Sequence, residues 1–322
     1  MLRLAGALLL SSCARASSIR LRPPSHIRLS NKMASTLFAS VSPDSSFETV
    51  EAPENPFRFS LQQTMLRIND PDATLSFYTK NFGFRLLHKY TFPQYGFDLL
   101  FLAIPPADDQ EEWPEPGTKE SEAKLWTLGY STLEFTYNYA SEELNNGNVE
   151  PHRGFGHIAV MTPDVYSACA DLEAAGCRFQ KKPDEGRMKG IAFVLDPQGY
   201  WIEVIPRSPS SVVSPGTKFT LAQTMKRIKD PVKSLHFYRD LLGMSLLRVA
   251  HHEDFSNYFL AHLPPGTKHP APDSAEASEF IKSMFFQVLE LTHNHGTELD
   301  PDFSYHNGND QDKGQKRGER RP

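Results

Sequence analysis

Polar side chains of metal-binding type interrupt several apolar runs that are otherwise suited to β-strands. Gln63 opens one such run, and Glu134 stands between leucine and phenylalanine. Further along, His157 follows a Gly-Phe-Gly sequence, and Glu203 stands between isoleucine and valine. A lone carboxylate among apolar neighbours is costly to bury unless a cation or hydrogen bonds compensate its charge. Each of two segments thus offers an amide or imidazole near its first strand and a carboxylate on its last, a pattern that favours a metal site.

Each of these residues also has an ordinary interpretation when it is taken alone. A glutamate on a strand usually points to solvent, and a single histidine is more often a hydrogen-bonded core residue than a ligand. An isolated glutamine carries almost no information. Recurrence shifts this balance, because Gln223 and Glu290 repeat the pair Gln63 and Glu134 in equivalent sequence settings.

An internal repeat accounts for this recurrence. The segment LQQTMLRINDPDATLSFYTKNFGFRLL starts at Leu61, and LAQTMKRIKDPVKSLHFYRDLLGMSLL starts at Leu221, an offset of 160 residues. Further on, STLEFTYN around Glu134 matches QVLELTHN around Glu290 at an offset of 156 residues. The intervening loop has therefore lost four residues (160 − 156) in the second copy. Matching runs of this length identify two copies of one unit.

Each copy is built from modules in which a strand and a helix are followed by further strands. Asp70 is a good N-cap, Pro71 suits the first helical position, and Gly83 can take the left-handed conformation that ends a helix. The stretch from Gly156 to Phe179 repeats this order, whereas residues 104–122 are predicted to form a long polar loop. The pattern predicts an α+β fold with three of four βαβββ modules present, which cover residues 61–135, 155–206 and 219–292.

Composition sets the expected domain boundaries. We expect a leader over residues 1–43, a first copy with two modules over 57–206, a linker over 207–217, and a truncated second copy with one module over 218–318. The Arg-Gly pair that leads into Phe-Gly-His157 in the first copy is followed in the second by Glu-Arg-Arg-Pro at 319–322. We expect the polar tail after Tyr305 to be disordered, and residues 319–322 to come from a frameshift or a mispredicted intron.

The leader and the charge balance bear on location and partners. Residues 1–43 contain six Arg or Lys residues and no acidic residue, which is typical of a mitochondrial transit peptide. Met33 is an alternative start that would give a cytoplasmic form, and a secretory signal is a further alternative, so we expect a cytoplasmic location, a mitochondrial one or both. The net charge of −5 without a basic stripe argues against nucleic acid as a partner, and no other segment suits a membrane.

Taken together, the motifs resemble glyoxalase I (lactoylglutathione lyase), of the vicinal-oxygen-chelate superfamily. In the first copy the resemblance rests on QQTMLRINDP, STLEFTYN, RGFGHIAVMTPDVYSAC, KKPDEGRMKG and FVLDPQGYWIEVI. In the second it rests on QTMKRIKDP, LELTHNHGT and SYHNGND. The matches span most of residues 61–206 and 219–318, and they are highly specific. The two-copy layout resembles the fused, monomeric glyoxalase I of fungi.

The resemblance implies one metal site that takes glutamine and glutamate from one module and histidine and glutamate from another. By motif, the metal-ligand positions are Gln63, Glu134, His157, Glu203, Gln223 and Glu290. The family favours Zn²⁺ for a eukaryotic enzyme of this length. Ni²⁺, Co²⁺ and Mn²⁺ stay open as alternatives, because this oxygen-rich ligand set does not by itself select zinc.

The resemblance also implies a reaction and a substrate. The reaction converts the hemithioacetal of methylglyoxal and glutathione, the co-substrate, into S-lactoylglutathione, which detoxifies methylglyoxal. The metal would stabilise an enediolate as a Lewis acid while Glu203 removes the C1 proton, with Glu290 as the second catalytic glutamate. Glutathione would be bound, by motif, by Arg67, Asn138, Arg153, His157, Arg187, Met188, Arg227 and Asn294. Arg187 stands where many family members carry lysine.

Three modules allow one complete site of this kind. Family architecture pairs a module of one copy with the complementary module of the other, so we expect a site formed by His157, Glu203, Gln223 and Glu290. Gln63 and Glu134 would then lack partners. The family favours a monomer, and a dimer is the alternative if the unpaired first module self-associates.

Two other functions are alternatives. One is a truncated, non-catalytic remnant that binds glutathione conjugates. The other is an extradiol dioxygenase, which needs an iron site of two histidines and one carboxylate, whereas glutamine occupies the first-strand place in both copies.

Overall fold

The structure is a computed structural model, and it describes residues 48–55, 59–106, 109, 112–140, 143–209, 218–285 and 287–309. The predicted leader (1–43), linker residues 210–217 and the tail at 319–322 lie outside the described residues. In the part of the chain that is described, no helix is long and apolar enough to cross a membrane.

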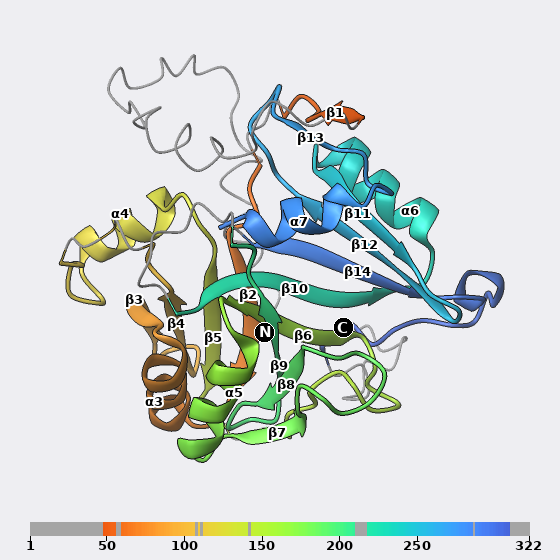
Figure 1. Cartoon of the computed structure of the whole chain (residues 1–322). Coiled ribbons are helices and arrows are strands. Elements are labelled where there is room, and N and C mark those ends of the chain that lie inside the picture. Colours follow the sequence, from red (N-terminus) through yellow and green to blue (C-terminus); the bar gives the residue numbers. More distant parts are fainter. Residues whose placement is uncertain are drawn as a thin grey trace, which may run out of the picture. The chain divides into compact units, whose positions relative to one another are not determined.

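A four-stranded sheet contains the strands of the first predicted module (Figure 1). The elements of this module are β2 (Gln63–Ile68), α3 (Pro71–Phe82), β3 (Arg85–Phe92), β4 (Phe97–Ala103) and β5 (Thr132–Asn138). The strand order is β2-β5-β4-β3; β2 runs parallel to β5, and the other pairs are antiparallel. We call it the first sheet.

Helix α3 begins and ends where local chemistry predicts. The Asp70 carboxylate accepts a hydrogen bond from the Ala73 amide, and Pro71 occupies the first turn, where its missing N–H costs nothing. Gly83 ends the helix with φ of +74°, and its amide donates to Thr79 O. Both predicted signals are therefore confirmed.

An eight-stranded sheet, the second sheet, joins the other two modules. From the second module come β6 (Phe155–Thr162), α5 (Val165–Ala174), β7 (Arg178–Lys181), β8 (Ala192–Leu195) and β9 (Trp201–Pro206). From the third come β10 (Thr220–Ile228), α6 (Pro231–Leu235), the π-helix η1 (His236–Leu241), β11 (Ser245–His251), β12 (Phe255–Ala261) and β14 (Val288–Asn294). The order is β11-β12-β14-β10-β6-β9-β8-β7, so antiparallel pairing of β10 with β6 joins the two modules.

Several elements lie outside the βαβββ order of the modules. They are β1 (Thr49–Glu51), which pairs with β13 (Lys268–Pro270), and α4 (Lys119–Thr127), α7 (Glu276–Ser283) and the short η2 (Thr297–Leu299). The predicted loop over 104–122 is wrong at its end, because α4 begins there with Thr118 as N-cap. Leu125 of α4 packs with Trp113 and Phe101 against the first sheet, so tertiary contacts favour this polar helix.

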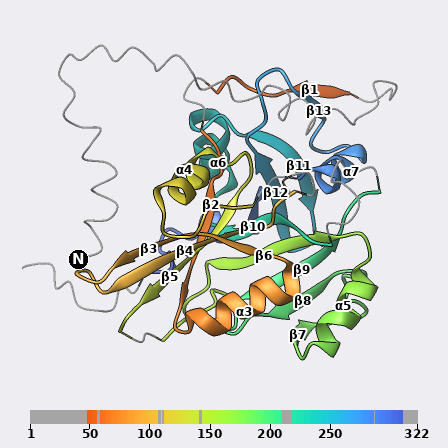
Figure 2. The same cartoon turned by 90° about the vertical axis from the view of Figure 1, so that its left-hand side faces the viewer.

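The largest hydrophobic cluster combines the first and second modules with Phe219 and Leu221 at the start of the third. Tyr78 and Phe82 of α3 belong to the same cluster as Leu172 of α5 and Ile158 of β6, and each is almost completely buried. Figure 2 shows α3 beside β8 and β9. Full burial of one such aromatic side chain contributes about 2–3 kcal/mol. The α+β class is thus confirmed, with short helices packed on mostly antiparallel strands.

Candidate metal centre

Strand register places four of the predicted ligand residues on one face of the second sheet. Along β6 and β9, Ala159 lies opposite Glu203, and the same Ala159 pairs with Gln223 of β10. His157 pairs with Met225, which in turn lies opposite Glu290 of β14. Because side chains alternate between the faces of a sheet, His157, Glu203, Gln223 and Glu290 all project from the same side.

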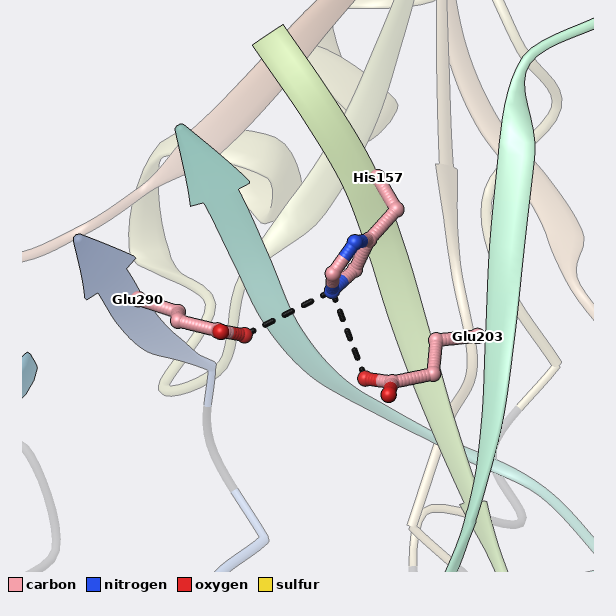
Figure 3. A group of neighbouring side chains, drawn as sticks. All are labelled: His157, Glu203 and Glu290. Atoms are coloured by element: carbon pink, nitrogen blue, oxygen red, sulfur yellow. Dashed lines mark ion pairs between the residues drawn. The ribbon is translucent and has the colours of Figure 1, made fainter. Parts of the chain in front are cut away.

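These side chains meet at short distances, and Figure 3 shows three of them, His157, Glu203 and Glu290. His157 Nε2 lies 3.3 Å from Glu203 Oε2 and 3.4 Å from Glu290 Oε2. Gln223 Nε2 donates to the same two oxygens, at 2.9 Å for Glu203 and 2.7 Å for Glu290. All four residues are at most 8 % exposed. Two modules, which share only one pair of neighbouring strands, therefore contribute two residues each to one buried polar group.

The electrostatics of the group favour a cation. Burial alone would lower the pKa of His157, but the carboxylates of Glu203 and Glu290 raise it to about 9. Two buried carboxylates beside one another need positive charge, and a proton on His157 or a metal ion can supply it.

The donor set fits a divalent metal. In the described part of the chain, His157 Nε2 is buried and makes no hydrogen bond of good geometry, although both carboxylates lie near it. The ligand atoms of His157, Glu203 and Glu290 lie within 4.8 Å of one another, and no other group of three such residues does so among the described residues. One imidazole, two carboxylates and an amide suit Zn²⁺, Ni²⁺, Co²⁺ or Mn²⁺.

Comparison of the chain with known proteins identifies its family. Residues 60–204 match the Glyoxalase/Bleomycin resistance protein/Dioxygenase superfamily. The chain is 42 % identical over 276 residues to glyoxalase I of Saccharomyces cerevisiae, which covers 82 % of this chain and 78 % of the yeast protein. It is 38 % identical over 262 residues to the lactoylglutathione lyase of Schizosaccharomyces pombe, covering 79 % of this chain and 78 % of that protein. The chain belongs to the glyoxalase I family.

A solved structure from the same family agrees with the fold. Glyoxalase I of Zea mays matches with a TM-score of 0.52 and 27 % sequence identity. The match covers 74 % of this chain and 68 % of the maize chain.

The remaining glutamine–glutamate pair of this glyoxalase I family member lies on the first sheet. Gln63 of β2 donates to the carboxylate of Glu134 on the parallel strand β5. Burial raises the pKa of Glu134, while hydrogen bonds from Thr136 and Gln63 lower it. No described contact joins this pair to the four residues on the second sheet, so the structure divides the six predicted ligand positions into a group of four and a pair.

Two of the predicted glutathione-binding arginines make several hydrogen bonds within the protein. Arg67 donates to Gly308 O at 2.7 Å and to Asn309 Oδ1 at 2.8 Å. Arg227 donates to three oxygen atoms in residues 147–155. The expectation of disorder after Tyr305 is therefore wrong for residues 306–309, of which Arg67 binds Gly308 and Asn309, whereas 310–322 lie outside the described residues.

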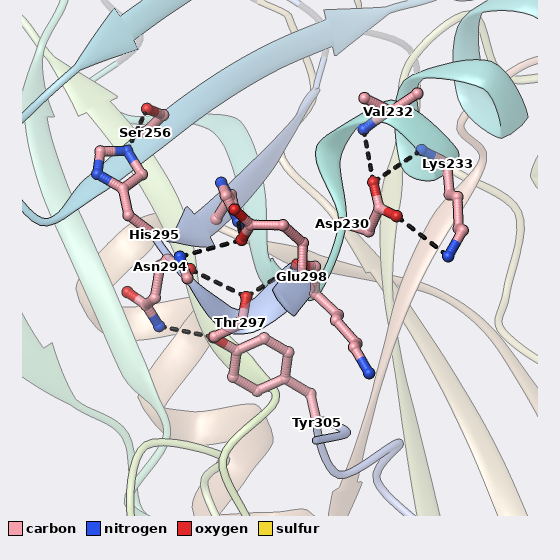
Figure 4. A network of polar contacts seen from close by, with 12 residues as sticks. Asp230, Val232, Lys233, Ser256, Asn294, His295, Thr297, Glu298 and Tyr305 are labelled. Carbon is pink, nitrogen blue, oxygen red and sulfur yellow. Dashed lines mark hydrogen bonds and ion pairs between the residues drawn. The ribbon is translucent and has the colours of Figure 1, made fainter. Parts of the chain in front are cut away.

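The other predicted substrate-binding residues have varied surroundings. Asn294, at the end of β14, donates to the Tyr305 hydroxyl at 2.6 Å (Figure 4). Arg153 lies 3.7 Å from the Glu150 carboxylate. Arg187 and Met188 are exposed in the loop that joins β7 to β8, and Asn138 ends β5 on the first sheet.

Asn257 is a residue of the site that the sequence analysis missed. This β12 side chain donates through Nδ2 to Glu290 Oε1, whereas Gln223 donates to the other carboxylate oxygen, Oε2. A signal was present in the repeat, because FSNYFLA in the second copy aligns with FDLLFLA in the first, where Leu99 takes the place of Asn257. Asn257 is thus another polar residue on an otherwise apolar strand.

Proposed function

We propose that this protein is a lactoylglutathione lyase, which isomerises the hemithioacetal of methylglyoxal and glutathione to S-lactoylglutathione and so detoxifies methylglyoxal. The observation that carries the proposal is the buried group of His157, Glu203, Gln223 and Glu290 at the junction of two modules. The relatives named glyoxalase I and lactoylglutathione lyase support it.

The metal would be held by His157 Nε2, by the carboxylates of Glu203 and Glu290, and by the side-chain amide of Gln223. A bound divalent ion supplies Lewis-acid polarisation of the substrate oxygens. We propose Zn²⁺ as this ion, with Ni²⁺, Co²⁺ and Mn²⁺ as alternatives that the donor set also suits.

The two glutamates are the groups that can move the proton between C1 and C2 of the hemithioacetal. They project from β9 and β14, on either side of the central strands β6 and β10, so substrate between them meets one carboxylate on each side. Glu290 accepts hydrogen bonds from both Gln223 and Asn257, which restrain its carboxylate. Glu203 accepts the bond from Gln223 alone among the described side chains, and we assign it as the base that removes the C1 proton.

Glutathione carries two carboxylates, which need cations or amide donors. Arg187 lies within the two modules that carry the proposed metal ligands, and Arg153 and Asn294 lie directly beside them. We propose these three residues as its contacts, with Met188 in the same loop as Arg187. The second and third modules thus supply the whole site, and the first module packs against the second through the shared core.

The test uses the purified full chain with methylglyoxal and glutathione. We expect the ultraviolet absorbance of the thioester to rise, the rise to stop when a chelator removes the metal, and activity to return when Zn²⁺ is restored. A protein that binds metal and glutathione conjugates but shows no rise would instead be a binding remnant, and the proposed activity would be wrong.

A further inference from the structure

Each copy of the repeat contains an Asn-Gly-Asn turn of the same conformation. The turns are Asn146-Gly147-Asn148 and Asn307-Gly308-Asn309. Gly147 has φ of +78° and Gly308 has φ of +83°, which is a conformation that favours glycine. In both turns the amide of the second asparagine donates to the side chain of the first at 2.9 Å. The two turns are therefore structural equivalents.

Each turn is bound by the arginine of the opposite copy. Arg67 of the first copy donates through Nη1 to Gly308 O at 2.7 Å and through Nη2 to Asn309 Oδ1 at 2.8 Å. Arg227 of the second copy donates through Nη1 to Gly147 O at 3.1 Å and through Nη2 to Asn148 Oδ1 at 2.9 Å. The same two nitrogens reach the same two acceptors in both places, as the rigid guanidinium fork requires.

The contacts of Arg227 extend to the backbone that leads into His157. Nη1 of Arg227 also donates to Phe155 O at 2.9 Å, and the main-chain amide of Arg227 donates to Gly154 O at 2.8 Å. Asn148, which Arg227 holds, donates through Nδ2 to Gly156 O at 2.6 Å. The carbonyl groups of all three residues before His157 are thus bound either by Arg227 or by the asparagine that it holds.

An irregularity in the sheet explains why this backbone needs side-chain support. The pairing of β6 with β10 shifts register between Met225, opposite His157, and Lys226, opposite Phe155. Such a bulge interrupts the regular ladder of main-chain hydrogen bonds. Buried carbonyl groups at this point need other donors, and Arg227 and Asn148 provide them.

We propose that Arg227 is a positioning residue: by holding Asn148 and the carbonyls of residues 154–156, it fixes the backbone from which His157 reaches the metal centre. This inference rests on the proposed function for the metal role of His157. It goes beyond the glutathione-binding role that the family resemblance implies for Arg227, because its guanidinium also makes three hydrogen bonds inside the protein.

The experiment measures the affinity of the metal-free full chain for Zn²⁺ by competition with a chromogenic chelator. We expect R227K, which keeps the charge but loses the fork, to weaken binding about 10- to 100-fold, as is typical when the support of a ligand histidine is removed. N148A should weaken it to a similar extent. Because both residues act through one turn, the double variant R227K/N148A should bind Zn²⁺ no more weakly than the weaker-binding of the two single variants.

Arg67 offers the matched control for metal binding. R67K breaks the equivalent contact with the other turn, whose described hydrogen bonds do not reach residues 154–156, so the Zn²⁺ affinity should stay within about twofold of the unchanged chain. Circular dichroism of each variant checks that it folds, and N148A carries the test if R227K does not.

Other results would overturn the assignment. If R227K keeps full Zn²⁺ affinity and only raises KM for the hemithioacetal, Arg227 acts on the substrate alone and does not position His157. Strictly additive losses in R227K and N148A would also contradict it. Absence of lyase activity in the unchanged chain would refute the proposed function, whereas the pattern of Zn²⁺ affinities would still decide the role of Arg227.

Discussion

The environment of each polar side chain, rather than its type, separates the two glutamine–glutamate pairs. Gln223 donates to both Glu203 and Glu290, beside the imidazole of His157, on a sheet that two modules share. Gln63 donates to Glu134 alone among the described side chains, on a sheet that belongs to one module. Identical motifs thus give one group with three ligand-type neighbours and one pair.

This difference predicts opposite results for two equivalent substitutions. Gln223→Ala should abolish lyase activity, because it removes a proposed ligand and the donor shared by both carboxylates. Gln63→Ala should change kcat/KM by less than about twofold, because its partner Glu134 lies on the other sheet. Steady-state kinetics of the two variants provide the test. If Gln63→Ala alone inactivates the enzyme, the first and second modules must pair instead, within one chain or between two.

At the scale of elements, a buried hydrogen bond joins helix α3 to the turn between β8 and β9. The Tyr78 hydroxyl donates to Asp196 Oδ2 at 3.1 Å. The other carboxylate oxygen of Asp196 accepts from the amides of Gln198 and Tyr200 at 2.9 and 2.8 Å. Asp196 is fully buried, and burial raises its pKa to about 6 despite these hydrogen bonds, which lower it.

This raised pKa predicts how stability changes with pH. The folded protein holds the proton of Asp196 more tightly than the unfolded chain, whose ordinary pKa is 3.8. The contribution of the protonated Asp196 to the free energy of unfolding is therefore fully present below about pH 4. It is lost as the pH rises through about 6, which lowers the free energy of unfolding by about 3 kcal/mol. Asp196→Asn, which cannot ionise, should lack this loss.

Urea unfolding of the wild type and Asp196→Asn at several values between about pH 4 and about pH 7 measures the effect. The difference in unfolding free energy between the two proteins should shift in favour of the asparagine variant as the pH rises. A difference that stays constant across this range would show that Asp196 does not titrate there.

At the scale of the whole molecule, the first sheet is joined to the rest of the chain by apolar and polar contacts. Its core residues, such as Phe135, belong to one cluster with Ile158 and Phe219. The hydroxyls of Thr64 and Thr224 lie 2.5 Å apart, on the equivalent strands β2 and β10 of the two copies. The repeat thus brings equivalent strands together at a buried polar contact.

The proposed metal would join two modules, because His157 and Glu203 come from one and Gln223 and Glu290 from the other. Zn²⁺ at about 100 times its Kd should therefore stabilise the folded chain by about 2.7 kcal/mol. Calorimetry or circular dichroism should show Tm rising by several degrees with Zn²⁺ and falling again with a chelator. Gln63→Ala should keep the rise of Tm with Zn²⁺, and Gln223→Ala should lose most of it. An equal rise in both variants would show that the ion binds elsewhere.

Local signals in the sequence were sufficient for most elements and for the residue types of the site. The Asp-Pro start and the glycine end of α3 act within one helical turn, so they are readable without any tertiary contact. A polar residue on an apolar strand likewise marked the ligand-type positions and, in retrospect, Asn257. Helix α4 was missed because few of its residues are buried, and its support comes from Leu125 and Trp113 in the folded chain.

By itself, the sequence determined the repeat, the α+β elements and the residue types of the candidate site, because each depends on neighbours close in the chain. The residues alone did not decide which pair meets His157, since the same motif stands at Gln63 and at Gln223. Only the antiparallel pairing of β6 with β10 settles that. The contacts of Arg227, whose acceptors lie 72 to 80 residues away, were likewise decided by the tertiary structure, because long-range contacts leave no local pattern.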